Sequence, residues 1–491
     1  MNWLFHGFGA DAVAGLVERI TEEYGEGRHF WIRDNLGQDR ITSHSRLTVI
    51  DHHAALTLTG DELPVVRGGE PMSEAIFELY TDLKPTVIKM MDRLDRYGPA
   101  RSYPQRESLY RRQFLYWLAF LREYQIEAFV GSNLPHEITD FLIAELLRVL
   151  SVRRVTFYQW TPDIVLPLND YRQLPDQKTR PAAPIGIADG EIVERVNQRI
   201  QNQQRGGESA TPFYMQADRI RRQKRKREAH WLRRATSKVR GIWTATGLRY
   251  AYYLLIEKNL LLPRRDRQFE EHYRARASAE LPLDVPFIYL ALHYQPEATT
   301  SPLGEAFVEQ YRIVDLLLAA FPENVSIYIK EHPNQRYIGR GDDYFARFPS
   351  STRIRFAAMD FSSADLVEHA IAVATVSGTV GFESLWKGKP VLLFGYTYYG
   401  GAPETYRIQN MADARLAAAA VLGHSAAVPN GSPEVFTRQL LERVIPANID
   451  TYYHDNSVEG LPPEHNVRIL SAEILARLSL PAPRRPVDPT A

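Results

Sequence analysis

Three short apolar runs, each followed at once by polar residues, glycine or proline, dominate the stretch from Phe287 to Gly395. They read FIYLALHYQPEATTSP, VSIYIKEHP and IAVATVSGTVGFESLWKGKPVLLFG. Uninterrupted apolar runs that alternate with helical segments are typical of strands in a parallel sheet buried on both faces. Because parallel strands deliver their following loops to one edge of the sheet, the pattern predicts an α/β domain with a ligand site at that edge.

The beginning of the chain shows the same alternation. Asn2–Gly7 is predicted to be a strand, Asp11–Tyr24 has the apolar spacing of a helix, and His29–Arg33 is predicted to be a second strand. This β-α-β order indicates a second Rossmann-like domain. Gly7 and Gly9 follow the first strand but do not complete a dinucleotide-binding fingerprint. A tight turn and a ligand contact therefore explain these two glycines equally well.

A polar cluster follows the predicted strand Ala128–Gly131. Asn133, His136 and Glu137 lie between that strand and the predicted helix Ile138–Leu150. Open α/β sheets bind ligands outside the carboxyl ends of their strands, so this cluster is a candidate site. Capping of the helix by Asn133 and Glu137 explains the same residues and is compatible with a ligand role.

The lysine and histidine of the sequence KEHP follow a predicted strand of the second domain. Lys330 carries a positive charge with three donors, and His332 can donate a hydrogen bond. Together they are suited to bind a phosphate or diphosphate, with Pro333 restricting the chain behind them. We expect this loop to leave the sheet at the same edge as the next polar cluster.

That next cluster is Ser377-Gly378-Thr379, which lies between a predicted strand and a predicted helix. Small residues let backbone N–H groups approach an anion, and a helix N-terminus adds a partial positive charge. Glu383 lies one helical turn beyond Thr379 and is placed to accept the hydroxyls of a ribose. Helix capping by Ser377 or Thr379 and a surface position for Glu383 are the alternatives, and we favour the nucleotide site.

The long polar loop after the strand that begins at Phe287 holds further candidates. Gln295 and Glu297 are expected near the base or the sugar of a nucleotide donor. Our working hypothesis is that these loops bind the nucleotide-sugar of a sugar-transferring enzyme. Transfer of a sugar requires a base for the acceptor hydroxyl or a nucleophile that forms a covalent adduct. Glu297, Glu137 and His136 are the catalytic candidates, with Asp140 as a further carboxylate, and the residues alone do not choose among them.

Composition excludes several classes of site. The chain has no cysteine, which rules out disulfides and Cys-ligated metals. His52 and His53 are adjacent rather than helically spaced, and neither HExxH nor DxD is present, so we predict no metal site and no cofactor. The net charge is +0, which gives no preference for nucleic acid.

The location of the protein is expected from two further features. The first residues lack the charged and apolar regions of a signal peptide, and no apolar run reaches the roughly 20 residues of a spanning helix. Residues 219–240 hold eleven Lys or Arg against one Glu and predict either a solvated helix or one attracted to anionic lipid or glycan. We expect a cytoplasmic protein, and the second alternative would make this basic segment its contact with the inner face of the plasma membrane.

Four motifs in this order resemble a known family. HYQPEATTSPLG, IKEHP, VSGTVGFESLWKGKPVLLFG and the upstream SNLPHEITDFLIAELL look like the capsular polysaccharide biosynthesis family, which includes bacterial β-Kdo transferases of GT-B fold. The similarity covers about residues 125–160 and 285–400. It implies an α/β protein with two Rossmann-like domains that face each other across a cleft.

The resemblance also implies roles for particular residues. In the Kdo and sialic acid transferases the donor is a CMP-sugar and an HP motif contacts its phosphate, a role that would fall on His332 and Pro333. The Ser/Thr cluster before a helix would fall on Ser377 and Thr379. The catalytic carboxylate of the first domain is not placed by any motif.

The prediction from sequence is a glycosyltransferase of surface polysaccharide synthesis that uses a nucleotide-sugar donor and a glycan or lipid-linked acceptor, without a metal. A nucleotide-sugar epimerase of similar fold and a non-catalytic assembly or export partner are the alternatives. The expected domains are an acceptor-side domain at 1–170, a helical basic insertion at 171–285, a nucleotide-sugar domain at 286–400, covering helices at 401–480 and a disordered tail at 481–491.

Overall fold

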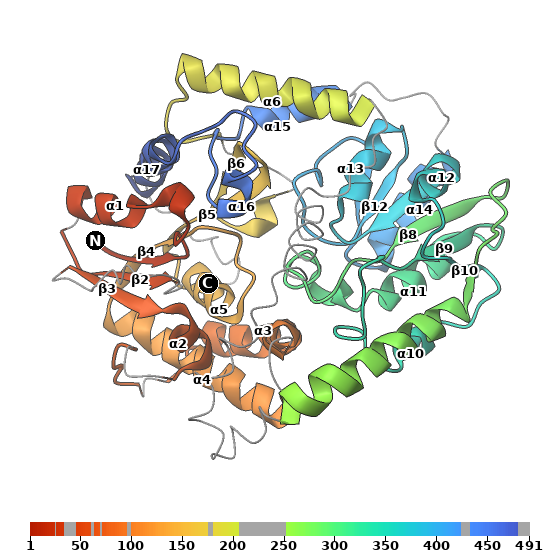
Figure 1. The fold of residues 1–491 in the computed structure, drawn as a ribbon, viewed down its shortest axis with the longest axis horizontal. Helices are drawn as coiled ribbons and strands as arrows, with labels where there is room; N and C mark the ends of the chain where they lie inside the picture. Colours follow the sequence, from red (N-terminus) through yellow and green to blue (C-terminus); the bar gives the residue numbers. More distant parts are fainter. Residues whose placement is uncertain are drawn as a thin grey trace. The chain divides into compact units, whose positions relative to one another are not determined.

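The protein consists of two compact units, which we describe separately from a computed structural model (Figure 1). The first unit comprises Met1–Ile88, Tyr103–Asn202 and Glu434–Ala491, and the second comprises Lys89–Ser102 and Gln203–Pro433. The residues that the structure describes are 1–24, 26–33, 46–59, 63–68, 71–95, 100–174, 180–205, 252–423 and 433–479. The basic segment 219–240 and the tail 481–491, for which the sequence made predictions, lie outside these residues.

The first unit contains a six-stranded sheet in the order β3-β2-β1-β4-β5-β6. All of its pairs are parallel except β5 with β6. The strand order reverses between β1 and β4, which is the switch point where α/β sheets bind ligands. The strands are β1 (Asn2–His6), β2 (His29–Arg33), β3 (Leu47–Asp51), β4 (Ile126–Gly131), β5 (Arg153–Thr161) and β6 (Ile164–Leu168).

Helices cover both faces of this sheet. Figure 1 shows α1 (Leu16–Tyr24) and α17 (Pro463–Ser479) on one side, and α2 (His52–Thr57) and α4 (Tyr103–Glu123) on the other. Aromatic side chains of α4 belong to the core, since Tyr110, Phe114, Trp117 and Phe120 are completely buried. The remaining helices are η1 (Asp11–Val13), α3 (Glu74–Asp95), α5 (Ile138–Val149), η2 (Tyr171–Gln173), α6 (Ile187–Arg205), α15 (Pro433–Leu441) and α16 (Thr451–His454).

The second unit contains a seven-stranded sheet in the order β13-β12-β11-β8-β9-β10-β7, in which every pair is parallel. Read from β8 onward, this is the Rossmann order 3-2-1-4-5-6 with β7 added at one edge. Its switch point lies between β8 and β11. The strands are β7 (Ala277–Ser278), β8 (Phe287–Ala291), β9 (Ser326–Lys330), β10 (Ile354–Ala357), β11 (Ala372–Thr375), β12 (Val391–Leu393) and β13 (Thr405–Arg407).

Two hydrophobic clusters hold helices on the two faces of the second sheet. The larger one joins the sheet to α10 (Leu262–Arg274), α11 (Tyr311–Ala320) and α14 (Met411–Gly423). The smaller one joins the opposite face to α12 (Ser363–His369) and α13 (Thr379–Trp386). The short elements are η4 (Tyr253–Leu261), η5 (Glu305–Val308) and η6 (Tyr344–Arg347).

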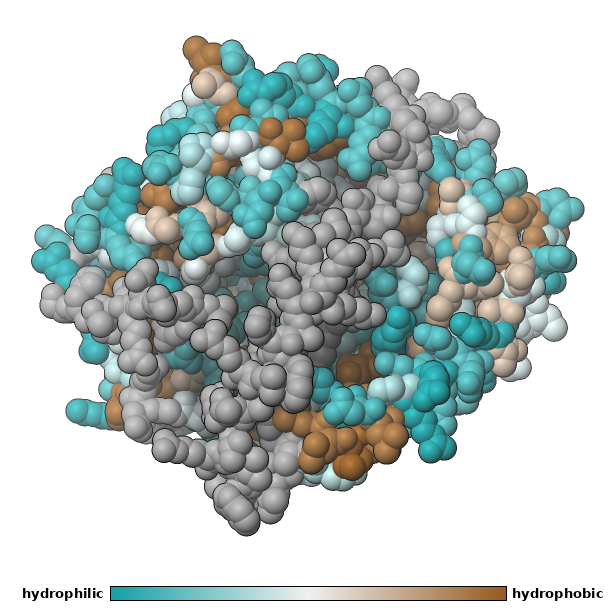
Figure 2. Space-filling model, viewed as in Figure 1, coloured by the Kyte–Doolittle hydropathy of each residue, from teal (hydrophilic) through white to brown (hydrophobic). Residues whose placement is uncertain are grey.

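The surface of η4 departs from the mostly hydrophilic face of the molecule. Tyr252, Leu255 and Leu260 are exposed, with 70% of Leu255 and 61% of Leu260 accessible to solvent. Figure 2 shows a hydrophobic patch where this helix lies. None of the helices in the described residues combines the length and the hydropathy that crossing a membrane requires.

The predicted pair of Rossmann-like domains is confirmed by these two sheets, and several details differ. Residues 305–320, whose sequence is helical in character, form two pieces, η5 and α11, and the buried Gln310 at the break bonds both the N–H and the carbonyl of His293. Strand β6 was not predicted, since Pro167 within it reads as a strand breaker. Strand β3 was also missed.

The C-terminal helices also differ from their prediction as a single covering layer. Only α14 packs on the second sheet, whereas residues 434–479 belong to the first unit. Ile445 forms a β-bridge with Val165, and Leu470 and Ile474 enter the core of the first sheet. The structure thus divides the chain at other places than the sequence pattern indicates, because the last helices return to the unit in which the chain began.

A buried aspartate fastens this returning segment. The Asp163 carboxylate accepts hydrogen bonds from the Asn448 amide (2.9 Å), the Ser457 hydroxyl and the Val458 N–H (3.0 Å). The Arg199 guanidinium lies 3.5 Å away. Asp163 itself is completely buried, so these groups have no water to replace it.

We predict that Asp163→Ala lowers the free energy of unfolding by about 3 kcal/mol or more, because several buried donors lose their acceptor at once. Asp455→Ala, which removes an exposed carboxylate of the same segment, should change it by less than about 1 kcal/mol. Urea denaturation of the two variants checks this. Equal losses would show that Asp163 does not fasten the segment.

Candidate functional site

The switch point of the second sheet brings together the loops that the sequence singled out. Strands β11, β8 and β9 are neighbours, and Ser377–Thr379, His293 and Lys330–Pro333 lie at or just beyond their respective carboxyl ends. Since the three strands are parallel, the loops leave the sheet at one edge, as predicted. The residues below are described from β8 outward.

His293 joins the loop after β8 to the loop after β11. Its Nε2 accepts hydrogen bonds from the Thr375 hydroxyl (2.8 Å) and from the N–H groups of Val376 (3.2 Å) and Ser377 (3.3 Å). Burial, together with nearby His332 and Arg340, lowers the pKa of His293 to about 3, so the ring is neutral. A side chain at Gly378 would place its Cβ 2.9 Å from this ring, which is why a glycine occupies that position.

A buried ion pair joins the loop after β8 to the loop after β9. The Arg340 guanidinium bonds both carboxylate oxygens of Glu331, at 2.8 and 3.1 Å, and both side chains are completely buried. Arg340 also donates to the His293 carbonyl (2.7 Å) and to the Gln295 side chain. The Glu331 carboxylate in turn accepts from the His332 N–H (2.8 Å). This pair was not predicted from the sequence.

We predict that Arg340→Met lowers the free energy of unfolding by about 3–5 kcal/mol, because it leaves the Glu331 carboxylate buried without a partner. The double variant Glu331→Met, Arg340→Met should recover part of that loss, since it removes both charges. Arg347→Met breaks an exposed pair with Asp343 and should cost less than about 1 kcal/mol. Chemical denaturation is the measurement, and a loss for Arg340→Met no larger than for Arg347→Met would contradict this account.

His332 retains a hydrogen-bond donor for a ligand. Burial, together with Arg340 and Lys330, lowers the pKa of His332 to about 4, so the imidazole is neutral at pH 7. Its Nδ1 accepts from the Asn334 N–H (3.1 Å), which places the proton on Nε2. Among the described residues no hydrogen-bond partner for Nε2 is found. Pro333 follows on the surface.

Lys330, the other predicted phosphate ligand of the KEHP sequence, is hydrogen-bonded within the protein. Its Nζ donates to the Phe361 carbonyl (2.5 Å) and to the Ser363 hydroxyl (2.8 Å), so two of its three protons hold the loop before α12. Burial lowers the pKa of Lys330. Phosphate binding by Lys330 stays a prediction that relies on the third proton.

The hydroxyls of the Ser-Gly-Thr cluster are also used within the protein. The Ser377 hydroxyl donates to the Thr299 carbonyl (2.7 Å), and the Thr379 hydroxyl bonds the Glu383 carboxylate. Burial raises the pKa of Glu383, which the bond from Thr379 partly offsets. A phosphate accepts but does not donate, so the two hydroxyls could serve it only by giving up these bonds. Their contact with phosphate, and that of Glu383 with ribose, stay predictions.

Gln295 and Glu297 belong to the loop after β8. The Gln295 amide donates to the Val308 carbonyl (2.6 Å) and accepts from Arg340, so both of its ends stabilise the loop. Glu297 is half-buried, and its carboxylate is 3.5 Å from the Thr299 hydroxyl. The structure thus gives Gln295 a positioning role, while a ligand contact of either residue stays a prediction.

We predict that the second unit loses stability on acidification. His293 and His332 have pKa values of about 3 and about 4 when folded and 6.5 ordinarily, so below pH 6.5 the unfolded chain binds more protons. Stability is therefore complete above pH 6.5 and falls as the pH drops toward 4, by up to about 1.4 kcal/mol per pH unit for each histidine.

Unfolding curves of wild type and His332→Gln between pH 7 and 4.5 measure this. On acidification, His332→Gln should lose less free energy of unfolding than wild type, and the difference should equal the contribution of one histidine. The exposed His369→Gln should behave as wild type. Parallel curves for wild type and His332→Gln would show that His332 is not held neutral.

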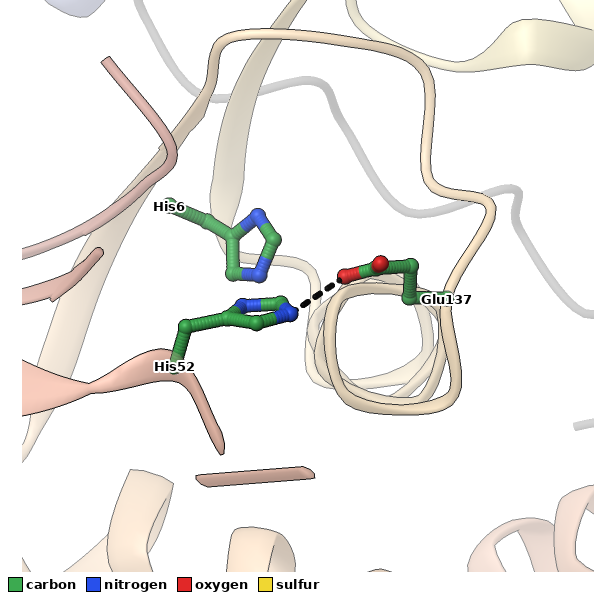
Figure 3. Close-up of side chains that lie close together, drawn as sticks. All are labelled: His6, His52 and Glu137. Carbon is green, nitrogen blue, oxygen red and sulfur yellow. Dashed lines mark ion pairs between the residues drawn. The ribbon is translucent and has the colours of Figure 1, made fainter. Parts of the chain in front are cut away.

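A second cluster lies at the switch point of the first sheet (Figure 3). His6 ends β1, His52 begins α2 directly after β3, and Glu137 precedes α5 after β4. The His52 Nε2 lies 2.9 Å from the Glu137 carboxylate, and the rings of His6 and His52 are 5.5 Å apart between centroids. Glu137 was a predicted site residue, but His6 and His52 were missed. The signal that could have found them is that each stands at the end of a strand.

The charges of this cluster limit what Glu137 can do. Burial alone would raise the pKa of Glu137, but the hydrogen bond from His52 and the nearby His136 and His6 hold it at about 2. A carboxylate of such low pKa is a weak base at neutral pH. The Nδ1 of His136, another predicted candidate, lies 2.7 Å from the Leu134 carbonyl.

Helix capping, the alternative offered by the sequence, is also present. Glu137 is the N-cap residue of α5, and its N–H donates to the Asp140 carboxylate (2.8 Å). The Asn133 side chain accepts from the Leu134 N–H (2.7 Å). Gly7 has a φ of 84° and its Cβ would collide with Ser132, so the tight turn accounts for this glycine.

Comparison with known families finds a match to part of the second unit. Residues 251–420 match the family model of capsule polysaccharide biosynthesis proteins. This match lies within the second unit. The matched residues contain the whole switch-point site from His293 to Glu383, so the family resemblance predicted from the motifs is confirmed. No curated protein matched the chain.

The chain is also similar to several solved structures. A KpsC from Thermosulfurimonas dismutans, a β-Kdo 2,4 transferase, is 16% identical, with 64% of this chain and 78% of that chain covered and a TM-score of 0.28. The UDP-GlcNAc 2-epimerase of Methanocaldococcus jannaschii is 10% identical, with 90% and 98% covered and a TM-score of 0.26. The trehalose 6-phosphate synthase of Burkholderia multivorans is 12% identical, with 99% of each chain covered and a TM-score of 0.28.

Proposed function

We propose that the protein is a glycosyltransferase of capsule or related surface polysaccharide synthesis, which takes its sugar from a nucleotide donor. The family match supports this, because it falls on the unit whose switch point carries the candidate donor site. The observation that carries the proposal is His332, a neutral imidazole whose Nε2–H faces no partner among the described residues. Such a donor suits the oxygen of a phosphate.

The donor phosphate would be held without a metal at this site. His332 would donate from Nε2, and the first N–H groups of α13 would contribute the partial positive charge of a helix N-terminus. Gly378 is the N-cap residue of α13 and offers no side-chain cap, so it does not compete with an anion for these groups. On the family resemblance we favour a CMP-linked, Kdo-like sugar.

In the reaction, an acceptor hydroxyl would attack the anomeric carbon while the bond from that carbon to the donor phosphate oxygen breaks. The phosphate would leave with the electron pair, and the His332 N–H would stabilise its negative charge. A base must take the hydroxyl proton. Glu297 and His136 remain candidates beside Glu137, whose pKa of about 2 makes it a weak base at neutral pH.

The acceptor is proposed to be a glycan or a lipid-linked glycan at the inner face of the membrane. The exposed apolar side chains of η4 support a membrane contact, because Lys258, Arg264 and Arg265 are exposed on or beside the same helix. Apolar and cationic side chains together are what binds an anionic lipid surface. The basic segment 219–240, named for this role by its sequence, precedes η4 in the chain.

We predict that CMP, or a CMP-sugar, raises the melting temperature of the protein and that His332→Gln weakens this ligand by about 10–100-fold. That range is the cost of losing one hydrogen bond to a charged group. His369→Gln, on the exposed side of α12, is the matched control and should bind as wild type. A thermal-shift titration with CMP, UDP, GDP and their sugars gives both the affinity and the donor class.

If no nucleotide shifts the melting temperature, the proposed function is wrong. Consumption of a nucleotide-sugar with no acceptor present would favour an epimerase instead, and binding of glycan without any turnover would favour the non-catalytic partner. A coupled assay for the released nucleotide, run with and without a lipid-linked acceptor, separates these outcomes.

A further inference from the structure

The cluster at the switch point of the first sheet has the composition of a metal centre. His6, His52 and Glu137 each offer one ligand atom, and these three atoms all lie within 4.8 Å of one another. Figure 3 shows the three side chains pointing toward one another from three separate elements. Two imidazoles and one carboxylate form a ligand set that zinc sites commonly use.

An unsatisfied nitrogen gives independent evidence for a ligand at this place. His6 is 8% exposed, and its Nε2 is buried without any hydrogen-bond partner. Buried polar atoms are nearly always satisfied, so such an atom calls for an explanation. The other ring nitrogen, Nδ1, lies 3.9 Å from the buried Asp140 carboxylate. This carboxylate favours the proton on Nδ1 and leaves the Nε2 lone pair directed at the cluster.

We propose that His6, His52 and Glu137 bind a divalent transition-metal ion such as Zn²⁺. Ligand atoms about 2.0–2.1 Å from a tetrahedral zinc lie about 3.4 Å from one another. Because the three atoms already lie within 4.8 Å, no separation needs to close by more than about 1.4 Å, and the 2.9 Å between the His52 Nε2 and the Glu137 carboxylate needs to widen by about 0.5 Å. Small rotations of the half-buried His52 and Glu137 side chains supply such a movement.

The elements that carry the ligands are held in place by buried hydrogen bonds. The Gln113 amide of α4 donates to the carbonyls of Ala55 and Leu56 in α2, both at 2.8 Å. The Thr139 hydroxyl of α5 lies 3.3 Å from the same Ala55 carbonyl. The helix that begins with His52 is thus fixed to the helix that begins after Glu137, and this preorganisation favours binding.

An ion would reach this centre and would keep a position for another ligand. The side chains of His52 and Glu137 are 17% and 34% exposed, which opens the cluster to solvent on one side. Three protein ligands leave the fourth position of a tetrahedral zinc to water or to a substrate oxygen. The substrate class that suits this position is a hydroxyl or carboxylate oxygen, although metal binding itself does not depend on the proposed transferase function.

The sequence predicts no metal site because its ligands come from three distant segments. None of the spacings that identify zinc sites occurs, and His53, the residue that makes the histidine pair conspicuous, is exposed and is not part of the cluster. The sheet order, which places the ends of β1 and β4 side by side, is what assembles the ligands.

The test is metal binding by the full chain with any affinity tag removed. After EDTA treatment and desalting, we expect one equivalent of Zn²⁺ to bind in a calorimetric titration and one equivalent of Co²⁺ to give the visible spectrum of a nitrogen-ligated, tetrahedral site. Mg²⁺, which prefers oxygen ligands, should not compete. Absence of a stoichiometric Co²⁺ spectrum in wild type would overturn the proposal by itself.

Variants locate the ion. His52→Ala and Glu137→Gln should each weaken Zn²⁺ at least about 100-fold, since even loss of a group that supports a ligand costs 10–100-fold. His53→Ala, the next residue on the same helix, should bind as wild type. Melting temperatures measured in EDTA establish that the variants are folded. Equal Zn²⁺ affinity in His52→Ala, Glu137→Gln and wild type would show that the ion binds elsewhere, whatever the outcome of the nucleotide titrations.

Discussion

The buried pair of Glu331 and Arg340 is the interaction on which the second unit's site depends. Its guanidinium joins the carboxylate after β9 to the carbonyl of His293 after β8, and the carboxylate fixes the N–H of His332. In an interior of low dielectric constant such a network is costly to leave half-satisfied, so its geometry is tightly specified. The donor that His332 presents is therefore positioned by two side chains that are themselves completely buried.

The two units use the same position of the same sheet order in opposite ways. Each has a histidine at or just after the end of the strand next to its switch point, His6 after β1 and His293 after β8. Three donors fill the Nε2 of His293, which makes that ring a structural link. The Nε2 of His6 has no such donors. The His293 ring thus links two loops of its unit, whereas the His6 ring has a nitrogen that is available to a ligand.

Local patterns explain how much the sequence could predict. Strands such as Phe287–Ala291 are short apolar runs whose ends are visible in the residues that follow, so the loops at the sheet edge were found. The hydrogen-bond partner of each donor was not found, because that partner is distant in the sequence. Nothing beside Lys330 indicates that Phe361 accepts its protons, and nothing beside Glu331 indicates that Arg340 is its partner. The His6, His52 and Glu137 cluster is assembled by strand order, which local patterns do not contain.

The return of the C-terminal helices to the first sheet affects the order in which the protein is made. The hydrogen bonds of Asp163 form only when Asn448 and Val458 are present, and the core around β1 is complete only with Leu470 and Ile474. All of these residues leave the ribosome after the second unit, whose last residue is Pro433. During synthesis the unit that begins first is consequently finished last, against the usual order in which the N-terminal domain folds before the rest.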